Sequence, residues 1–365
     1  MNHSNQIISK TLKISKEEML DDFLLINISR NISYIGRKEV FMGRAKFGVF
    51  GDGKELPQIA MSKFFRNGDF RSGYYRDQTF MMSIDQLTPD QFFAQLYAHT
   101  DIEKDPHSGG RQMNCHFGTR LLNKKGEWKT QTDMMNSSSD VSCVSGQMPR
   151  IVGLAYASKL YRNNKKLSNM ENFSINGNEV VFGTIGDAST SEGHFWEAIN
   201  ACGVLQVPLV MSIWDDGYGI SVPSEYHTTR NDLSKVLSGF QRSSKNESGF
   251  EIFTVKAWDY INLIKTYQRA VQISRDNHVP CIIHVKEVTQ PQGHTTSGSH
   301  ERYKSKERLK WEKDFCCIRK MKEWILKNGY ASNKEIEKIE KDAEIIAKKS
   351  RDRSWRSYRD DIKLD

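Results

Sequence analysis

Two aspartates follow short apolar runs in the middle of the chain and could together bind a metal ion. Asp187 comes shortly after residues 180–185, and Asp216 comes after residues 208–214, 29 positions further on (216 − 187). Continuous apolar runs of this length are typical of strands that are covered on both faces. Because neighbouring parallel strands open their carboxyl ends onto one crevice, both carboxylates are expected to converge on a hard cation such as Mg²⁺.

Each aspartate alone has a plainer interpretation, since acidic loop residues often cap helices and turns. The segment 191–206 carries Phe195, Ile199 and Cys202 on one face at helical spacing. The amino end of such a helix would direct backbone N–H groups towards an anion. The pair of aspartates and this helix therefore predict a joint site for a cation and a phosphate group.

The elements that must position these residues alternate along the chain. Residues 252–257 and 280–285 read as further strands, and residues 260–277 read as the helix between them. Repeated strand, helix and strand units form parallel sheets with right-handed crossovers. The sequence therefore predicts an α/β fold, with a doubly wound, mostly parallel sheet and helices on both faces.

The rest of the chain is divided by its composition. Residues 101–142 are rich in Gly, Asn, Ser and Asp, which predicts long loops, and loops of this length in a compact domain are usually functional. After Glu307 the chain is charged and helical in pattern, with Gly329 as a stop between two helices. We expect an N-terminal helical extension over 1–45, an α/β domain over 46–310 and a C-terminal helical segment over 311–365.

Composition gives weaker indications. The formal net charge is +8 and the sequence pI is near 9.0, but basic and acidic residues are interleaved, so we expect no nucleic-acid partner. No apolar run approaches the ~18 residues of a membrane span. Met1–Lys10 is polar, without the apolar core of a signal peptide, which predicts a cytoplasmic protein without membrane contact.

The cysteines show neither a Cys-x-x-Cys pair nor a histidine at zinc-ligand spacing. We expect them to be reduced thiols. They are Cys115, Cys143, Cys202, Cys281, Cys316 and Cys317.

The two strand ends resemble a known pair of motifs. Gly186-Asp187-Ala188 and Asp215-Asp216 are similar to the Gly-Asp-Gly and Asn-Asn motifs of thiamine diphosphate enzymes, which occur at a similar separation. The resemblance implies a thiamine-diphosphate-binding fold. It also implies that Mg²⁺ is held by Asp187, Asp216 and the backbone oxygen of Tyr218.

Further segments, from about Lys46 to Tyr303, resemble the alpha subunits of 2-oxoacid dehydrogenases in the same order. They are residues 74–77 (Tyr-Tyr-Arg-Asp), 110–118 (Gly-Arg-Gln-Met-Asn-Cys-His-Phe-Gly), 142–149 (Ser-Cys-Val-Ser-Gly-Gln-Met-Pro) and 289–297 (Thr-Gln-Pro-Gln-Gly-His-Thr-Thr-Ser). The resemblance implies that His294 is catalytic. It implies cofactor contacts from Tyr75, Arg76, Ser142, Val144, Gly186, Asp187, Ala188, Ser189 and His294.

Five positions depart from the pattern. Ala188 replaces the motif glycine, which narrows the φ choices, and Asp215-Asp216 replaces Asn-Asn. Trp214 and Gln290 stand where branched-chain enzymes place arginines that bind the diphosphate. We expect Arg76, or another basic side chain such as Arg111, to compensate for those arginines.

The resemblance implies a thiamine-diphosphate-dependent, oxidative decarboxylation of a branched-chain 2-oxoacid, with acyl transfer to a lipoyl-bearing acyltransferase. Nothing in the sequence matches the glutamate that relays a proton to the cofactor, so a beta subunit is expected to supply it in an alpha2-beta2 assembly. The chain would be a separate alpha subunit or part of a fused alpha-beta chain. The alternatives are a pyruvate dehydrogenase alpha subunit and a degenerate, non-catalytic protein of the same fold. A transketolase is disfavoured, because it would carry its glutamate in a longer chain.

Overall fold

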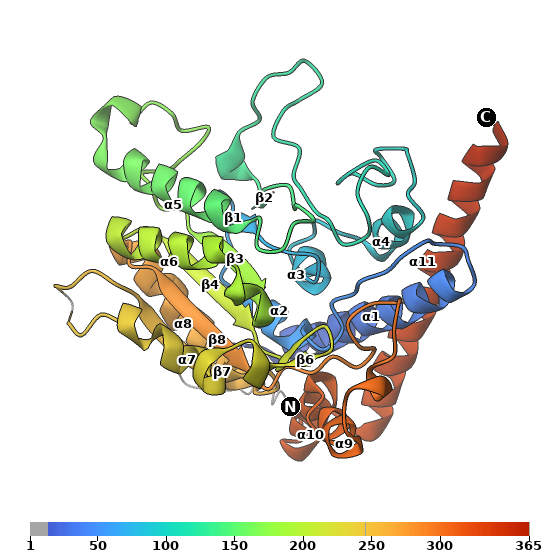
Figure 1. Cartoon of the computed structure of the whole chain (residues 1–365). Helices are drawn as coiled ribbons and strands as arrows, with labels where there is room; N and C mark the ends of the chain where they lie inside the picture. The colour runs from blue at the N-terminus through green and yellow to red at the C-terminus, as the bar shows by residue number, and fades with distance from the viewer. Residues whose placement is uncertain (1–13, 245, 365) are drawn as a thin grey trace, which may run out of the picture.

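The computed structural model describes residues 14–244 and 246–364. Its centre is a six-stranded sheet in the order β2-β1-β3-β4-β8-β7, in which every pairing is parallel (Figure 1). The strands are β1 (Phe70–Ser72), β2 (Asn136–Ser137), β3 (Val181–Gly186), β4 (Leu209–Trp214), β7 (Glu251–Lys256) and β8 (Cys281–Lys286). The predicted doubly wound α/β fold is thus confirmed.

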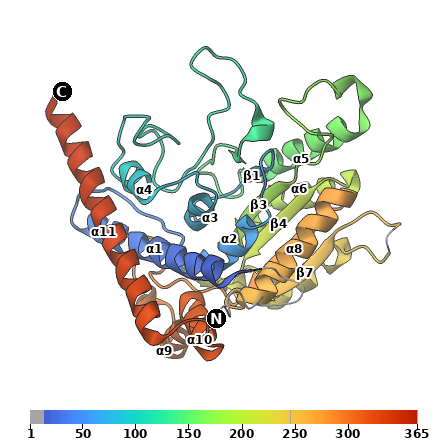
Figure 2. The same ribbon diagram turned by 180° about the vertical axis from the view of Figure 1, so that it is seen from behind.

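Helices cover both faces of this sheet because alternate strand residues point to opposite sides. On one face, Val181, Ile185 and Met211 pack with α5 (Met148–Asn163) and α6 (Gly193–Leu205). On the other face, Phe182 and Val210 pack with α2 (Glu55–Ser62) and α8 (Tyr260–Asn277). Figure 2, seen from behind, shows α2 and α8 in front of the strands. The two apolar clusters account for the uninterrupted apolar runs in the sequence.

The predicted strands and crossover helices occur in the structure with small shifts. The strand expected at 180–185 begins at Val181 and ends at Gly186, and α8 matches the predicted helix 260–277. The helix expected at 191–206 begins at Gly193, because the residues before it form a 3-10 turn, η3 (Ala188–Ser191). Element type follows from the apolar period, whereas the first residue of a helix depends on local turn geometry.

The helices at the two ends of the described chain pack on one another. α1 (Lys16–Phe41) lies against α11 (Asn333–Leu364), and both contribute to the apolar cluster on the α8 face of the sheet. α9 (Lys306–Asp314) and α10 (Cys317–Lys327) precede α11, and Gly329, with φ +69°, stands before its start as predicted. The boundaries proposed at 45 and 310 remain predictions. Met1–Lys10 lies outside the described residues.

The segment between β1 and α5 is anchored at its base by a buried arginine. The segment contains α3 (Gln78–Ser83), α4 (Pro89–Leu96) and η1 (Gln131–Asp133), and long loops join them, as predicted. Arg71, fully buried on β1, donates hydrogen bonds to the carboxylates of Asp77 (2.8 Å) and Asp140 (3.0 Å). This network holds the loop before α5 against the sheet, next to the predicted site.

Shorter elements complete the fold. They are the hairpin of β5 (Tyr218–Gly219) and β6 (Val222–Pro223), the helix α7 (Leu233–Val236), and the 3-10 turns η2 (Lys165–Leu167), η4 (Ser224–Tyr226), η5 (Thr229–Asn231), η6 (Leu237–Phe240) and η7 (His300–Arg302). All six cysteines are free thiols, as predicted. Among the described residues, no helix has the length and apolar character needed to cross a membrane.

Candidate cofactor site

A cavity of about 310 Å³ opens at the carboxyl ends of β3 and β4. Of the residues predicted to bind cofactor or metal, all except Ser142 line it. The lining consists of Lys54, Tyr74, Tyr75, Arg76, Val144, Gly186, Asp187, Ala188, Ser189, Trp214, Asp216, Tyr218, Gly219, Ile220 and His294. The fold therefore brings together side chains that are up to 240 positions apart in the sequence (294 − 54).

The two aspartates lie at this edge because β3 and β4 pair in register, with Gly186 opposite Trp214. The Asp187 side chain is buried, and in the described part of the chain its Oδ2 atom has no hydrogen-bond partner. Burial raises the pKa of Asp187 well above its usual range, and repulsion from Asp216 raises it further. A buried, unpartnered carboxylate beside a second one is the arrangement that a cation would stabilise, so these residues fit Mg²⁺.

Asp216 faces the cavity, whereas Asp215 turns away from it. The Asp215 carboxylate accepts a hydrogen bond from His284 Nε2 on β8, at 2.8 Å. Burial alone would raise the pKa of Asp216, but Lys54, Lys304 and Arg76 outweigh burial and hold that pKa below its usual range. Of the Asp215-Asp216 pair, the second residue is therefore the one placed to meet a metal.

Protein carboxylates would not complete the coordination of a metal here. In the part of the chain that the structure describes, no three or more His, Cys, Asp or Glu side chains are grouped to hold a metal ion. Mg²⁺ is usually bound by one or two carboxylates together with substrate phosphates and water. The two aspartates and the predicted backbone oxygen of Tyr218 fit an ion that arrives with a diphosphate.

Arg76 joins two walls of the cavity. Its guanidinium donates to the backbone oxygen of Phe50 (2.6 Å) and to that of His294 (2.9 Å), and it stacks 5.1 Å from the centre of the Tyr75 ring. Because neutral carbonyl groups accept these bonds, the positive charge of Arg76 is left without a bonded carboxylate. That charge remains available to an anion in the cavity.

His294 is half-buried at the same wall. Burial lowers the pKa of its imidazole to about 4, and Arg76 and Lys54 contribute to the lowering, which Asp216 partly opposes. The imidazole is therefore neutral at physiological pH. A neutral ring can accept a proton inside the cavity, in keeping with the catalytic role predicted for His294.

We expect His294 to titrate near pH 4, and the stability of the ligand-free chain to show its effect. The unfolded imidazole, with a pKa of 6.5, binds its proton first. The stability that neutral His294 contributes is thus present above pH 6.5 and lost as pH falls from there through about 4. The slope of unfolding free energy against pH reports how many more protons the unfolded chain binds than the folded chain. In that pH window, His294→Gln should lower this number by up to about one. Denaturant titrations at several pH values measure this, and an unchanged slope would contradict it.

The loop before α5 is placed differently from the prediction at one residue. Val144 lies at the cavity mouth, but Ser142 does not line the cavity, and its hydroxyl lies 3.1 Å from His116 Nε2. Ser145 donates a hydrogen bond to the backbone oxygen of Ser189 at 2.6 Å, which joins this loop to η3. The loop therefore contacts the site through residues 144 and 145. Ser142 lies on the same loop but outside the cavity lining.

The alanine in place of the motif glycine is accommodated without strain. Ala188 begins a regular 3-10 turn and is not in the left-handed φ region. Its methyl group occupies space beside Gly219, where an added Cβ atom would lie only 2.8 Å from the Cβ atom of Ala188. The departure at position 188 is thus compensated by the absence of a side chain at position 219.

Sequence reasoning missed Lys54, which is the most deeply buried cation of the site. Its side chain is 1% exposed, and its Nζ atom donates to Gln290 Oε1 at 2.6 Å and to Asp216 Oδ2 at 3.2 Å. Arg111, proposed as a compensating cation, instead donates to the backbone of Ser108 and does not line the cavity. The glycines at 51 and 53 were the available signal, since they mark a tight turn beside a charged residue.

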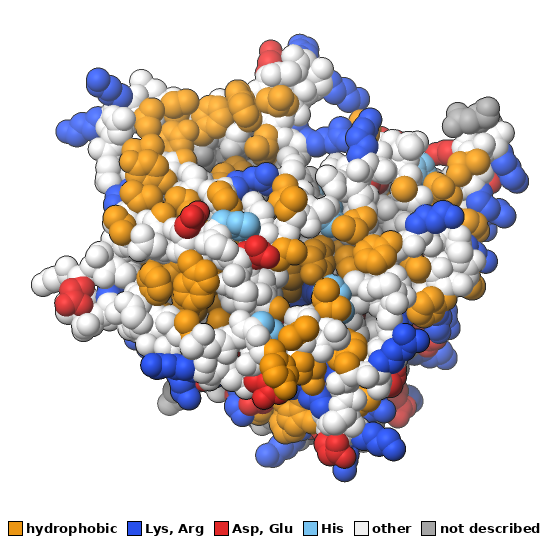
Figure 3. Space-filling model, viewed as in Figure 1, with side chains coloured by type: hydrophobic (Ala, Val, Ile, Leu, Met, Phe, Trp, Pro, Cys, Tyr) orange, Lys and Arg blue, Asp and Glu red, His pale blue; other side chains and the backbone are white. Residues whose placement is uncertain are grey.

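Exposed apolar side chains line the cavity or lie on the segment that follows its lining. Val144 and Ile220, which line the cavity, are 51% and 62% exposed, and Val222 on β6 and Tyr226 in η4 are 44% and 76% exposed. Figure 3 shows hydrophobic side chains gathered around the centre of this face of the molecule. Clustered apolar exposure of this kind is typical of a surface that another protein covers.

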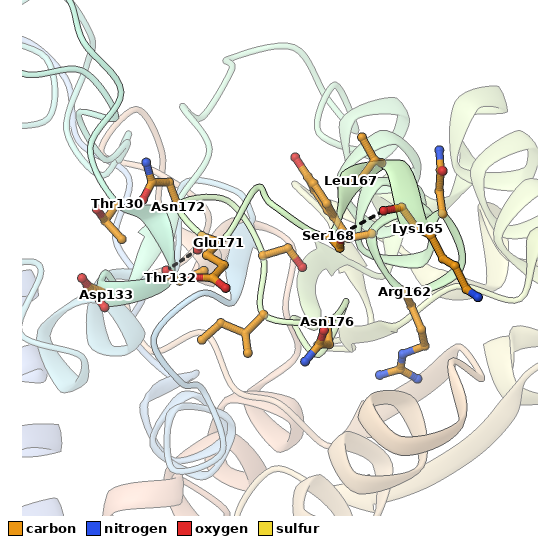
Figure 4. A pocket seen from close by; sticks show the side chains of 14 residues that line it. Thr130, Thr132, Asp133, Arg162, Lys165, Leu167, Ser168, Glu171, Asn172 and Asn176 are labelled. Atoms are coloured by element: carbon orange, nitrogen blue, oxygen red, sulfur yellow. Dashed lines mark hydrogen bonds between the residues drawn. The ribbon is translucent and has the colours of Figure 1, made fainter.

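A second cavity lies away from these residues. It has a volume of about 550 Å³ and is formed by the end of α5, η2 and the segment around η1 (Figure 4). Its walls are mostly polar, and two of the lining residues, Thr132 and Ser168, donate their hydroxyl hydrogens to backbone oxygens. None of the predicted site residues line it.

Comparison with known proteins agrees with this geometry. Residues 26–356 match the model of the dehydrogenase E1 component family. The human mitochondrial 2-oxoisovalerate dehydrogenase subunit alpha is 25% identical over 338 residues, which cover 90% of this chain and 66% of the relative. The Bacillus subtilis 2-oxoisovalerate dehydrogenase subunit alpha is 24% identical over 275 residues, or 75% of this chain and 72% of the relative.

A pyruvate-type relative is similar over a shorter stretch. The pyruvate dehydrogenase E1 component subunit alpha of Rickettsia bellii is 28% identical over 208 residues, which cover 57% of this chain and 56% of the relative. The chain thus spans 66% of the length of its human relative. Since the family model covers most of the chain, from α1 to α11, the protein belongs to the dehydrogenase E1 component family.

Proposed function

We propose that the protein is the alpha subunit of a thiamine-diphosphate-dependent 2-oxoacid dehydrogenase of the branched-chain type. The observation that carries this proposal is the single cavity that gathers Asp187, Asp216, Arg76 and His294. Relatives named 2-oxoisovalerate dehydrogenase subunit alpha support the substrate class. The reaction would be an oxidative decarboxylation that ends with acyl transfer to a lipoyl group on a second enzyme.

The residues of the cavity have separable roles in this proposal. Asp187, Asp216 and the backbone oxygen of Tyr218 would hold Mg²⁺, and Arg76 would supply positive charge to the diphosphate. When bound, thiamine diphosphate would supply the carbon nucleophile and the electron-accepting ring that decarboxylation of a 2-oxoacid needs. His294 would accept or return a proton at the wall of the cavity, because its imidazole is neutral at physiological pH.

A beta subunit would supply the carboxylic acid that the cavity lacks. The cavity lining includes no glutamate among the described residues. Glu192, Glu197 and Glu225 are exposed, and Glu287 is engaged by Trp258 Nε1 at 2.7 Å. The apolar side chains around the mouth suit the core of a protein interface. We therefore place the partner over this mouth, in an alpha2-beta2 assembly.

Turnover by the complex with its beta subunit tests the proposal. The kcat/KM for 3-methyl-2-oxobutanoate should exceed that for pyruvate by at least about tenfold, because a pocket shaped for additional methyl groups gains ~1–3 kcal/mol from each. The two acids are compared with an artificial electron acceptor in place of the lipoyl group. A preference for pyruvate would favour the alternative function, that of a pyruvate dehydrogenase alpha subunit. The similarity to the Rickettsia bellii relative supports that alternative.

The non-catalytic alternative has its own specific support. Trp214 and Gln290 stand in the cavity wall or beside it, where the branched-chain enzymes carry arginines. In a degenerate protein that no longer needs its cofactor site, binding of thiamine diphosphate would be weak or absent even in the presence of a beta subunit. Titration of the complex with thiamine diphosphate and Mg²⁺ separates the two readings.

A further inference from the structure

Lys54 reaches the candidate site through a turn that brings two segments unusually close. The turn of residues 51–54 precedes α2, and the Lys54 amide donates to the Gly51 oxygen at 3.2 Å. Gly53 has φ +93°, and an added Cβ atom there would lie 1.8 Å from the Thr289 backbone oxygen. Only glycine allows the backbone at position 53 to lie this close to Thr289. As a result, Lys54 lies beside Gln290, the residue after Thr289.

The position of the ammonium group is set by two side-chain oxygens. Gln290 Oε1 accepts from Nζ at 2.6 Å and Asp216 Oδ2 accepts at 3.2 Å. The ammonium therefore lies next to the side chain at position 290, where the resembled enzymes have an arginine, and next to the predicted Mg²⁺ ligand. The same residue, Lys54, also lines the cavity directly.

Unsatisfied polar atoms mark the same region. Gln290 Nε2, Tyr74 Oη, Trp214 Nε1 and Asp187 Oδ2 are buried and have no hydrogen-bond partner among the residues that the structure describes. Buried polar groups in native proteins almost always have hydrogen-bond partners. Several unpartnered polar atoms in one place therefore indicate a site for a polar ligand. Three of the four atoms can donate a hydrogen bond, which favours a ligand rich in acceptor oxygens.

We propose that Lys54 is a diphosphate-binding residue of this protein and takes the place of the arginines absent at positions 214 and 290. This inference rests on the proposed function and specifies how the site holds its anion. Lys54 is a buried point charge that a phosphate oxygen can meet in a dry cavity, and ammonium to phosphate bonds are among the stronger hydrogen bonds of proteins.

Asp216 also differs in charge from the residue of the resembled motif. The resembled motif has a neutral asparagine at this position, so this chain has one additional negative charge there, and that carboxylate pairs with Lys54. The Asp216 carboxylate accepts a hydrogen bond from the Lys54 ammonium at 3.2 Å, and the oxygens of a bound diphosphate would be further acceptors for that ammonium.

The test compares single and paired substitutions in the purified chain by titration calorimetry. Lys54→Gln removes the charge and keeps a hydrogen-bonding side chain, and Lys54→Gln with Gln290→Arg returns a positive charge to the same space. The ligands are thiamine diphosphate, inorganic diphosphate and thiamine, each with excess Mg²⁺. Lys235→Gln is the matched control, because Lys235 has a side chain that is 67% exposed and does not line the cavity.

We expect Lys54→Gln to weaken binding of both diphosphates by about 10- to 100-fold while leaving thiamine binding within about threefold, since only the diphosphates present the anion. The paired variant should recover most of that loss, and Lys235→Gln should match the unaltered chain. Melting temperatures show whether each variant is folded.

Equal losses for thiamine and for the diphosphates would mean that Lys54 only maintains the cavity, and no loss for any ligand would also overturn the inference. In both cases the unaltered chain would still bind the cofactor, so the proposed function would stand. If the unaltered chain bound neither diphosphate, both with and without a beta subunit, the proposed function and this inference would fail together.

Discussion

Asp187→Ala is expected to abolish the Mg²⁺-dependent binding of thiamine diphosphate, whereas Asp216→Asn is expected to retain it. Asp187 has a buried carboxylate oxygen without a partner, so its loss removes a ligand that no neighbouring group replaces. An asparagine at position 216 still offers an oxygen to the metal. We expect binding by Asp187→Ala to fall by more than about 100-fold, which corresponds to one charge-assisted metal contact of roughly 3 kcal/mol.

The same carboxylate should cost stability when no ligand is present. Burial and the nearby Asp216 raise the pKa of Asp187, which means that its charged form is disfavoured in the folded chain. Asp187→Asn keeps the shape of the side chain and removes the charge. It should increase the free energy of unfolding of the ligand-free chain by about 1–3 kcal/mol.

Two measurements decide the prediction together. Titration calorimetry with and without Mg²⁺ gives cofactor affinity, and urea denaturation of the ligand-free chain gives stability. Undiminished affinity in Asp187→Ala would rule out Asp187 as a ligand. A loss of both affinity and ligand-free stability in Asp187→Asn would mean that the carboxylate has a structural role instead.

The isolated chain is expected to show no decarboxylation of branched-chain 2-oxoacids, and a beta subunit is expected to restore it. A thiamine enzyme needs an acid beside the aminopyrimidine ring, held in a site that excludes water. The cavity of this chain is open at its mouth and has no glutamate in its lining. Both the missing acid and the missing cover would come from the partner.

The assay uses the purified chain with thiamine diphosphate, Mg²⁺, 3-methyl-2-oxobutanoate and an artificial electron acceptor, with and without the beta subunit. We expect the chain and the beta subunit that restores its activity to bury an interface of more than ~2,000 Å², as obligate complexes do. Replacing exposed Ile220 and Tyr226 by aspartate should prevent restoration without unfolding the chain. Turnover by the chain alone would contradict the shared site.

Much of the fold could be predicted because parallel strands leave a strong local signal. The apolar runs at β3, β4 and β8 are covered on both faces, and their carboxyl ends must meet at one edge of the sheet. That Asp187 lies near the Asp215-Asp216 pair follows from this alone. The strand pattern does not say which aspartate of the pair faces the cavity, since that depends on the bond from His284 to Asp215, and the choice of Asp216 rests on the motif resemblance.

The glycines at 51 and 53 mark a turn beside Lys54, but the partners of Lys54 could not be predicted because they are distant in sequence. Asp216 lies 162 positions away and Gln290 lies 236 positions away, and no periodic pattern connects them. Ser142 is a different case: its motif was recognised in the sequence, but its place outside the cavity lining depends on the conformation of the loop. Side chains on a loop follow its turns, and the sequence does not specify these turns as clearly as it specifies a strand.

The contact between positions 188 and 219 restricts the order in which these two residues can change during evolution. With a methyl group at 188, a side chain at 219 would overlap it at 2.8 Å, so alanine at 219 is excluded as a first step. A change to glycine at 188 would remove that overlap. Positions 188 and 219 are therefore coupled: the residue at each position limits which substitutions the other can accept.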